Sequence, residues 1–178
     1  MGSNFALHQQ AGIGEGPWPQ SIRDRYGVSA FSQFVGAQMI ADKYGFSREA
    51  MDAFALESHR KAAAAIEGGA FKAEIVPVPT ADGLFEQDEG VRFDATMEGM
   101  ASVKTLTEGG TITAANASQM TDGASGTLVA SADAVKRFGL TPIARIVNLT
   151  VTAGDPVIML EEPIPATQRA LQRAGMKL

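Results

Sequence analysis

The stretch Thr111-Ile-Thr-Ala-Ala-Asn-Ala-Ser-Gln-Met-Thr-Asp-Gly-Ala-Ser-Gly126 has a composition that ordinary core packing does not explain. Its alanines and glycines leave the backbone bare, so another chain segment or a ligand can approach closely. Four short hydrogen-bonding side chains lie between them: Asn116, Ser118, Thr121 and Asp122. Because an apolar run follows at Thr127 to Ala130, the stretch is predicted to be a turn between strands. A plain polar connecting loop fits the same composition.

The size and charge of the chain limit its class. With 178 residues, 45% of them hydrophobic, it is long enough to bury one core. A net charge of −5 argues against a basic groove for nucleic acid and against binding to an anionic membrane surface. Neither a signal peptide nor a membrane-spanning stretch is recognisable. We therefore expect a soluble, cytoplasmic protein whose partners include neither nucleic acid nor membrane.

The scarcity of metal-binding and nucleophilic residues narrows the chemistry further. There is no cysteine, which excludes disulfides, thiolate metal sites and a cysteine nucleophile within this polypeptide. The two histidines are His8 and His59, and His59 is expected in a solvated or hydrogen-bonded structural role rather than as a ligand. The acidic segment from Asp82 to Asp94 lacks calcium-loop spacing and is predicted to be a solvated loop. We expect no metal site.

The first half of the chain is predicted to be helical. An irregular lead-in over residues 1–24 precedes a helix from Phe31 to Tyr44. A second helix begins after Ser47, a good N-cap, and ends at Gly68. Its predicted buried stripe consists of Met51, Phe54, Ala55, Ser58, Ala62 and Ile66.

Strand and helix signals alternate in the remainder. A strand is predicted from Phe71 to Val78. Two strand and helix pairs then follow: strand Thr127–Ser131, helix Ala132–Phe138, strand Ile143–Val151 and helix Pro165–Ala174. This order predicts an α/β fold in which a helical lobe with a small sheet precedes strand-helix-strand-helix pieces.

A family resemblance supports the ligand-binding interpretation of the opening stretch. Residues 113–124 read T-A-A-N-A-S-Q-M-T-D-G-A, which resembles the serine-bearing loop T-A-G/A-N-[AS]-S-x-x-x-D-G-A of the thiolase family. The resemblance extends through Asp52–Ala62, Phe71–Pro77 and Pro163–Ala166. It implies a partial thiolase fold: a loop domain over 1–121, the last strand and helix of the N-terminal core over 122–142, and the first strand and helix of the C-terminal core over 143–178.

The resemblance implies a role in acyl transfer between a 3-ketoacyl-CoA, or acetyl-CoA, and coenzyme A. The family uses a thiolate nucleophile, a histidine and a second cysteine. The segments that carry them would lie before Met1 and after Leu178. We therefore expect no catalytic residue here, no cofactor apart from coenzyme A as substrate, and no thiolase turnover by this chain alone.

What the resemblance assigns to this chain is the coenzyme A side. Ser118 would hydrogen-bond the pantetheine arm, with Ala114 packing beside it. Arg92 would lie against the adenine, although a solvated surface arginine is an alternative. The remaining implied contacts are Leu106 near the pantetheine and Met159 in the acyl pocket. Met100 is also included among the predicted contacts, although methionine is usually core filler.

Two interpretations of the whole chain remain open. The first is part of a thiolase, acetyl-CoA acetyltransferase or degradative 3-ketoacyl-CoA thiolase, that forms a dimer or tetramer with copies of itself. The second is a non-catalytic coenzyme A-binding or structural module. Ser32-Gln33 and Leu160–Pro163 depart from the short-chain pocket motifs of the family, so the size and shape of the acyl group are left open. Because family members bury this segment against further sheets, exposed apolar surface is expected.

Overall fold

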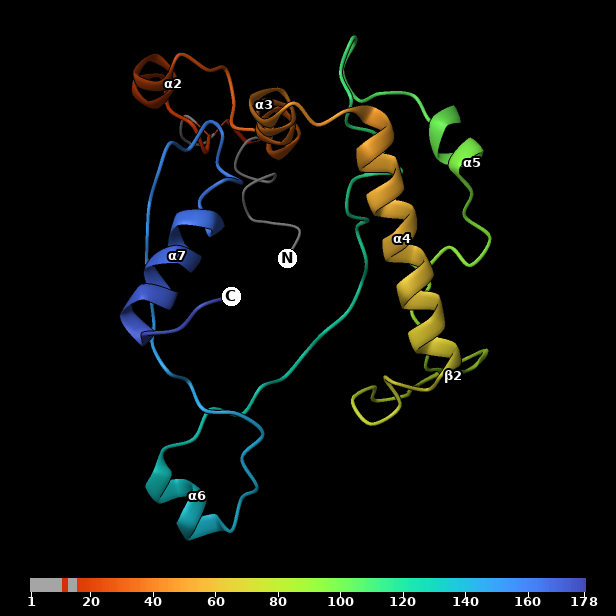
Figure 1. Cartoon of the computed structure of the whole chain (residues 1–178), viewed down its shortest axis with the longest axis vertical. Coiled ribbons are helices and arrows are strands. Elements are labelled where there is room, and N and C mark those ends of the chain that lie inside the picture. Colours follow the sequence, from red (N-terminus) through yellow and green to blue (C-terminus); the bar gives the residue numbers. More distant parts are fainter. Residues whose placement is uncertain (1–10, 13–15) are drawn as a thin grey trace. The chain divides into compact units, whose positions relative to one another are not determined.

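Figure 1 shows the computed structural model, which describes residues 11–12 and 16–178. These residues belong to two compact units. The first unit comprises the described residues up to Lys43 together with Val147–Leu178, and the second comprises Tyr44–Ile146. Most of the predicted lead-in, including His8, lies outside the described residues. Among the described helices, none combines the length and the apolarity needed to cross a membrane.

The first unit contains a helix that sequence patterning did not predict. Helix α2 spans Gln20–Tyr26, so the predicted irregular lead-in is wrong for its last residues. Few apolar residues occur in this helix, which is why its periodicity is weak. Contacts outside the helix stabilise it instead: the ring of Tyr26 meets that of Phe31 edge-on, with 5.6 Å between centroids. Gly27 ends the helix in the left-handed conformation that favours glycine.

Helix α3, Gln33–Tyr44, packs closely against a later segment of the same unit. A Cβ at Gly36 would lie only 2.7 Å from the backbone oxygen of Ile158, so this approach depends on glycine. At the end of the helix, Lys43 Nζ lies 2.6 Å from Glu161 Oε1. The helix predicted from Phe31 is thus confirmed, with a start two residues later.

Helix α7 completes the first unit. It spans Pro163–Ala174, two residues longer at its start than predicted, with Pro163 in the first turn. Gly175 follows in the left-handed conformation, as expected for a helix C-terminus.

The second unit is built along α4, Arg48–Glu67, a helix of 20 residues. Ser47 caps it as predicted, since its Oγ accepts a hydrogen bond of 3.1 Å from the Ala50 amide. The short helix α5, Met97–Ser102, packs on α4 (Figure 1) and was not predicted. The sequence feature that marks the start of α5 is its N-cap, Thr96, whose Oγ1 accepts a hydrogen bond of 3.1 Å from the Gly99 amide.

The predicted apolar stripe of α4 is wrong in part. Phe54 is 79% exposed and Ser58 is also exposed, whereas Asp52 is 1% exposed. Apolar periodicity cannot find a buried carboxylate, because burial of a charge depends on partners supplied by other segments. Those partners are Arg48, on the same helix, and Asn116, far along the chain.

The sheet of the second unit is a small antiparallel pair. Strand β1, Val78–Thr80, pairs with β2, Gly83–Phe85, with Pro79 opposite Leu84. The strand predicted from Phe71 is wrong except for its last residue. Turns occupy that region, where the Ile75 amide donates to the Phe71 carbonyl at 3.1 Å.

The later strands are not formed, although the helix between them is. Helix α6 spans Ala132–Phe138, as predicted, but residues 127–131 and 143–151 belong to no strand. A strand needs a neighbour to satisfy its backbone, and these segments have no pairing in the described chain. Their apolar side chains are correspondingly open: Ile143 is 103% exposed, Leu149 82% and Val151 87%. The expected exposed apolar surface is confirmed, as is the helical lobe with a small sheet.

Candidate functional site

The stretch at Thr111–Gly126 begins with a tight turn that is fixed by its own hydrogen bonds. Thr113 is fully buried, and its Oγ1 accepts from the amides of Ala115 at 3.1 Å and Asn116 at 3.2 Å. Its carbonyl accepts from the Ala117 amide at 3.0 Å. Three consecutive amides are therefore bound to one residue, which fixes the backbone leading into Ser118.

The Asn116 side chain closes the same turn. Its Oδ1 accepts from the Thr113 amide at 2.8 Å, and its Nδ2 donates to the Thr111 carbonyl at 3.0 Å. The second Nδ2 hydrogen goes to Asp52 Oδ1 at 2.9 Å. The amide thus joins the turn to itself and to helix α4.

Asn116 is hydrogen-bonded to a buried ion pair formed by Arg48 and Asp52. Arg48 Nε donates to Asp52 Oδ2 at 2.6 Å, and the two residues are one helical turn apart on α4. Arg48 Nη2 also donates to the carbonyls of Met100 at 2.7 Å and Val103 at 3.0 Å. Each carboxylate oxygen of Asp52 therefore has its own donor, and α4, α5 and the turn share one network.

The predicted pantetheine contacts lie on this fixed turn and beside it. Ala114 and Ser118 are both exposed. Leu106 is 45% exposed, and its amide donates to the Ile112 carbonyl at 2.8 Å, just before the turn. The backbone is anchored by buried groups, while the side chains predicted to contact a ligand are accessible.

Arg92 lies on a segment that approaches the residues following Ser118. A Cβ at Gly90 would lie 2.9 Å from Gln119 Oε1, so the two segments are in contact there. The side chain of Arg92 is exposed, and its amide donates to His59 Nδ1 at 3.2 Å. The hydrogen-bonded structural role predicted for His59 is confirmed.

The two methionines predicted at the site have different surroundings. Met100 is 4% exposed and belongs to the core of the second unit. Met159 belongs to the first unit and has a positive φ of 35°, which is uncommon for a residue other than glycine. Five of the six predicted site residues therefore share one compact unit.

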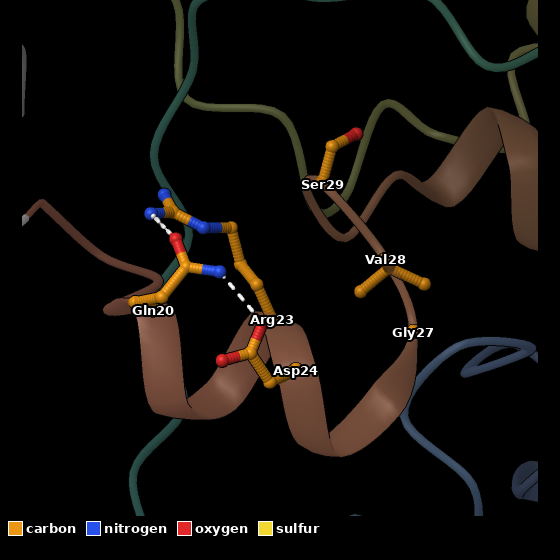
Figure 2. Close-up of a pocket in the computed structure, with 6 residues that line it drawn as sticks. All are labelled: Gln20, Arg23, Asp24, Gly27, Val28 and Ser29. Atoms are coloured by element: carbon orange, nitrogen blue, oxygen red, sulfur yellow. Dashed lines mark hydrogen bonds between the residues drawn. The ribbon is translucent and has the colours of Figure 1, made fainter.

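A separate recess of about 500 Å³ lies against α2 in the first unit (Figure 2). Its lining contains none of the predicted site residues and consists of Gln20, Arg23, Asp24, Gly27, Val28 and Ser29. Gln20 occupies its polar side, accepting from Arg23 at 2.7 Å and donating to Asp24 at 2.6 Å. Across the described chain, no group of three histidine, aspartate or glutamate side chains is placed to hold a metal ion.

Sequence reasoning missed the two residues that support the turn from behind, Arg48 and Asp52, and the close approach of Gly90 to Gln119. Only the spacing of Arg48 and Asp52, four residues apart on one helix, was visible as a possible ion pair. Their link to a turn more than 60 residues away is a product of the fold.

Comparisons with known proteins agree with the motif. A family profile described as the N-terminal domain of thiolases matches residues 25–133, more than half of the chain. The steroid 3-ketoacyl-CoA thiolase of Mycobacterium tuberculosis is 49% identical over 154 residues, covering 86% of this chain and 38% of that protein. The acetyl-CoA acetyltransferase of Escherichia coli is 43% identical over 149 residues, covering 81% and 38%. The chain spans about 38% of the length of these relatives and belongs to the thiolase family.

Proposed function

We propose that this chain supplies the coenzyme A side of a thiolase that transfers an acyl group between a 3-ketoacyl-CoA, or acetyl-CoA, and coenzyme A. The names of the relatives support an acyl-CoA substrate, since they are 3-ketoacyl-CoA thiolases and acetyl-CoA acetyltransferases. The substrate of the relatives includes a long, thin arm with amide groups. Such an arm requires a close backbone and a small number of fixed hydrogen-bonding groups.

The observation that carries the proposal is the fixed turn ending at Ser118. The backbone from Thr113 to Ala117 is bound by buried groups, and Ser118 follows with an exposed side chain. A hydroxyl on a fixed backbone loses little entropy on binding a ligand amide. Ala114, on the same turn, is exposed and has only a methyl group, which leaves room for the arm.

Arg92 is proposed as the adenine contact. The planar guanidinium suits stacking on a base, and the side chain is exposed. The contact between Gly90 and Gln119 brings its segment to the residues that follow Ser118, which supports one continuous ligand path. Leu106, which is 45% exposed just before the turn, is the further proposed contact within this unit. Met159, in the first unit, is proposed by itself as an acyl-pocket residue, whereas the 4% exposed Met100 is core filler. The proposal also includes a cytoplasmic enzyme that assembles with copies of itself.

Calorimetric titration with coenzyme A tests the proposal through a matched pair of serine variants. Ser118→Ala removes the proposed hydrogen bond, whereas Ser125→Ala makes the same chemical change at another exposed position of the stretch. A hydrogen bond contributes about 0.5–1.5 kcal/mol, so Ser118→Ala is expected to weaken binding roughly 2- to 12-fold. Ser125→Ala is expected to bind as the unaltered chain does. Equal affinity in both variants would refute the role of Ser118.

A further inference from the structure

Asp52 is a charged side chain placed where charge is costly. It is 1% exposed, deeper than any other acidic or basic residue in the described chain. Burial of a carboxylate is tolerated when donors satisfy its oxygens. Here Oδ2 accepts from Arg48 at 2.6 Å and Oδ1 accepts from Asn116 at 2.9 Å.

The bond to Asn116 connects this buried charge to the turn before Ser118. The same amide group of Asn116 also donates to the Thr111 carbonyl, and its oxygen accepts from the Thr113 amide. The orientation of the amide therefore fixes both ends of the turn. Asp52 determines that orientation, because an acceptor at its position requires the nitrogen of Asn116 to face α4.

We propose that Asp52 and Arg48 are positioning residues for the Ser118 turn, and that they control the affinity for the pantetheine arm without contacting it. This inference rests on the proposed function for its ligand. The claim that the ion pair fixes the turn rests only on the hydrogen bonds that join Arg48, Asp52, Asn116 and the turn backbone. Arg48 contributes by donating to Asp52 and, through the Met100 and Val103 carbonyls, by fixing α5 against the same helix.

The two partners of Asp52 are both donors, which makes an isosteric substitution informative. In Asp52→Asn, one end of the new amide is a donor, so it faces either the Arg48 guanidinium or the Asn116 nitrogen. Either the contact with Arg48 or the contact with Asn116 then brings two donor groups together, although the side chain at position 52 keeps its size. The double variant Arg48→Gln with Asp52→Asn removes this conflict, because the glutamine oxygen can accept from the new amide.

Amide hydrogen exchange at Ala115, Asn116 and Ala117 reports on the turn without any ligand. Asp52→Asn is expected to raise their exchange rates about tenfold or more, the change expected when a buried donor loses its partner. The double variant is expected to restore most of the protection, which a general loss of packing would not do. Glu57→Gln is the control, since Glu57 pairs with Arg60 on the exposed side of the same helix and is expected to leave these amides unchanged. If Asp52→Asn fails to fold, the double variant and the single Arg48→Gln variant carry the test.

Coenzyme A affinity, measured by calorimetry on the same variants, tests the claim that Asp52 and Arg48 control the affinity for the pantetheine arm. Dissociation constants are expected to rise in Asp52→Asn and recover in the double variant, in parallel with the exchange rates. Unchanged exchange in Asp52→Asn would overturn the inference whether or not the ligand binds. Faster exchange with unchanged affinity would overturn the link to the pantetheine arm. An unaltered chain that fails to bind coenzyme A, yet whose turn loosens in Asp52→Asn, would refute the proposed function while supporting the anchoring of the turn.

Discussion

Replacement of Asp52 by alanine is predicted to be among the most destabilising single changes in the second unit. The substitution removes both acceptors at once and leaves Arg48 as an unpaired cation in a site where its side chain is 19% exposed. It also removes one of the two acceptors of the Asn116 nitrogen. The consequence is an uncompensated charge and a half-satisfied amide at the junction of α4 and the turn.

The magnitude follows from how much of this network survives. Loss of one partner from a buried ion pair costs about 3–5 kcal/mol. Arg48 keeps the carbonyls of Met100 and Val103, so the lower end of that range applies. We expect a decrease of about 3 kcal/mol in the free energy of unfolding, which lowers a urea midpoint by roughly 1.5 M for a denaturant slope near 2 kcal/mol/M.

Urea unfolding followed by far-ultraviolet circular dichroism measures this change. Glu57→Ala is the matched control, because it breaks an ion pair on the same helix in which the partner side chains are 69% and 43% exposed. Exposed pairs are screened by solvent, so this variant is expected to keep its midpoint. The reasoning would be refuted by equal midpoints for Asp52→Ala and Glu57→Ala.

Three further predictions concern other parts of the chain. Gly36→Ala should lower stability by about 1 kcal/mol in urea unfolding despite the better helix propensity of alanine, because its Cβ meets the Ile158 carbonyl; a stabilised variant would contradict this. The hydrogen bond from Arg60 lowers the pKa of Glu57, so the contribution of this exposed pair, too small to move the urea midpoint, is present above the ordinary carboxyl range and lost on acidification; NMR titration should show this pKa rising in Arg60→Gln, and an unchanged value would refute the pairing. The chain, which contains no cysteine, should not cleave acetoacetyl-CoA by itself, and measurable thiolysis would overturn that expectation.

Local signals in the sequence predicted the local features of the fold. Ser47 caps α4 because its hydroxyl accepts from an amide three residues later, an interaction that needs no distant partner. Gly139 and Gly175 end their helices in the left-handed conformation for the same kind of local reason. The small residues of the Thr111–Gly126 stretch predict a place of close approach, but a Cβ at Gly123 or Gly126 would have no neighbour within 4 Å among the described residues, so that part stays a prediction.

Features that depend on distant segments were not predictable from patterning. Asp52 looks like a solvent-facing helical residue until Asn116 is placed beside it, 64 positions later. The apolar run at Ile143–Val151 has strand composition, but a strand forms only where another strand is available to pair with it. In the described chain that partner is missing, and the run is left with exposed side chains.

The central claim is that coenzyme A lies along the Ser118 turn, and chemical-shift mapping with isotope-labelled protein tests it most directly. On titration with coenzyme A, the account predicts that the largest amide shifts occur at residues 113–120 and 90–92. Asp52→Asn should reduce them, while Glu57→Gln should not. Shifts confined to the recess at residues 20–29, with the turn unchanged, would contradict the account.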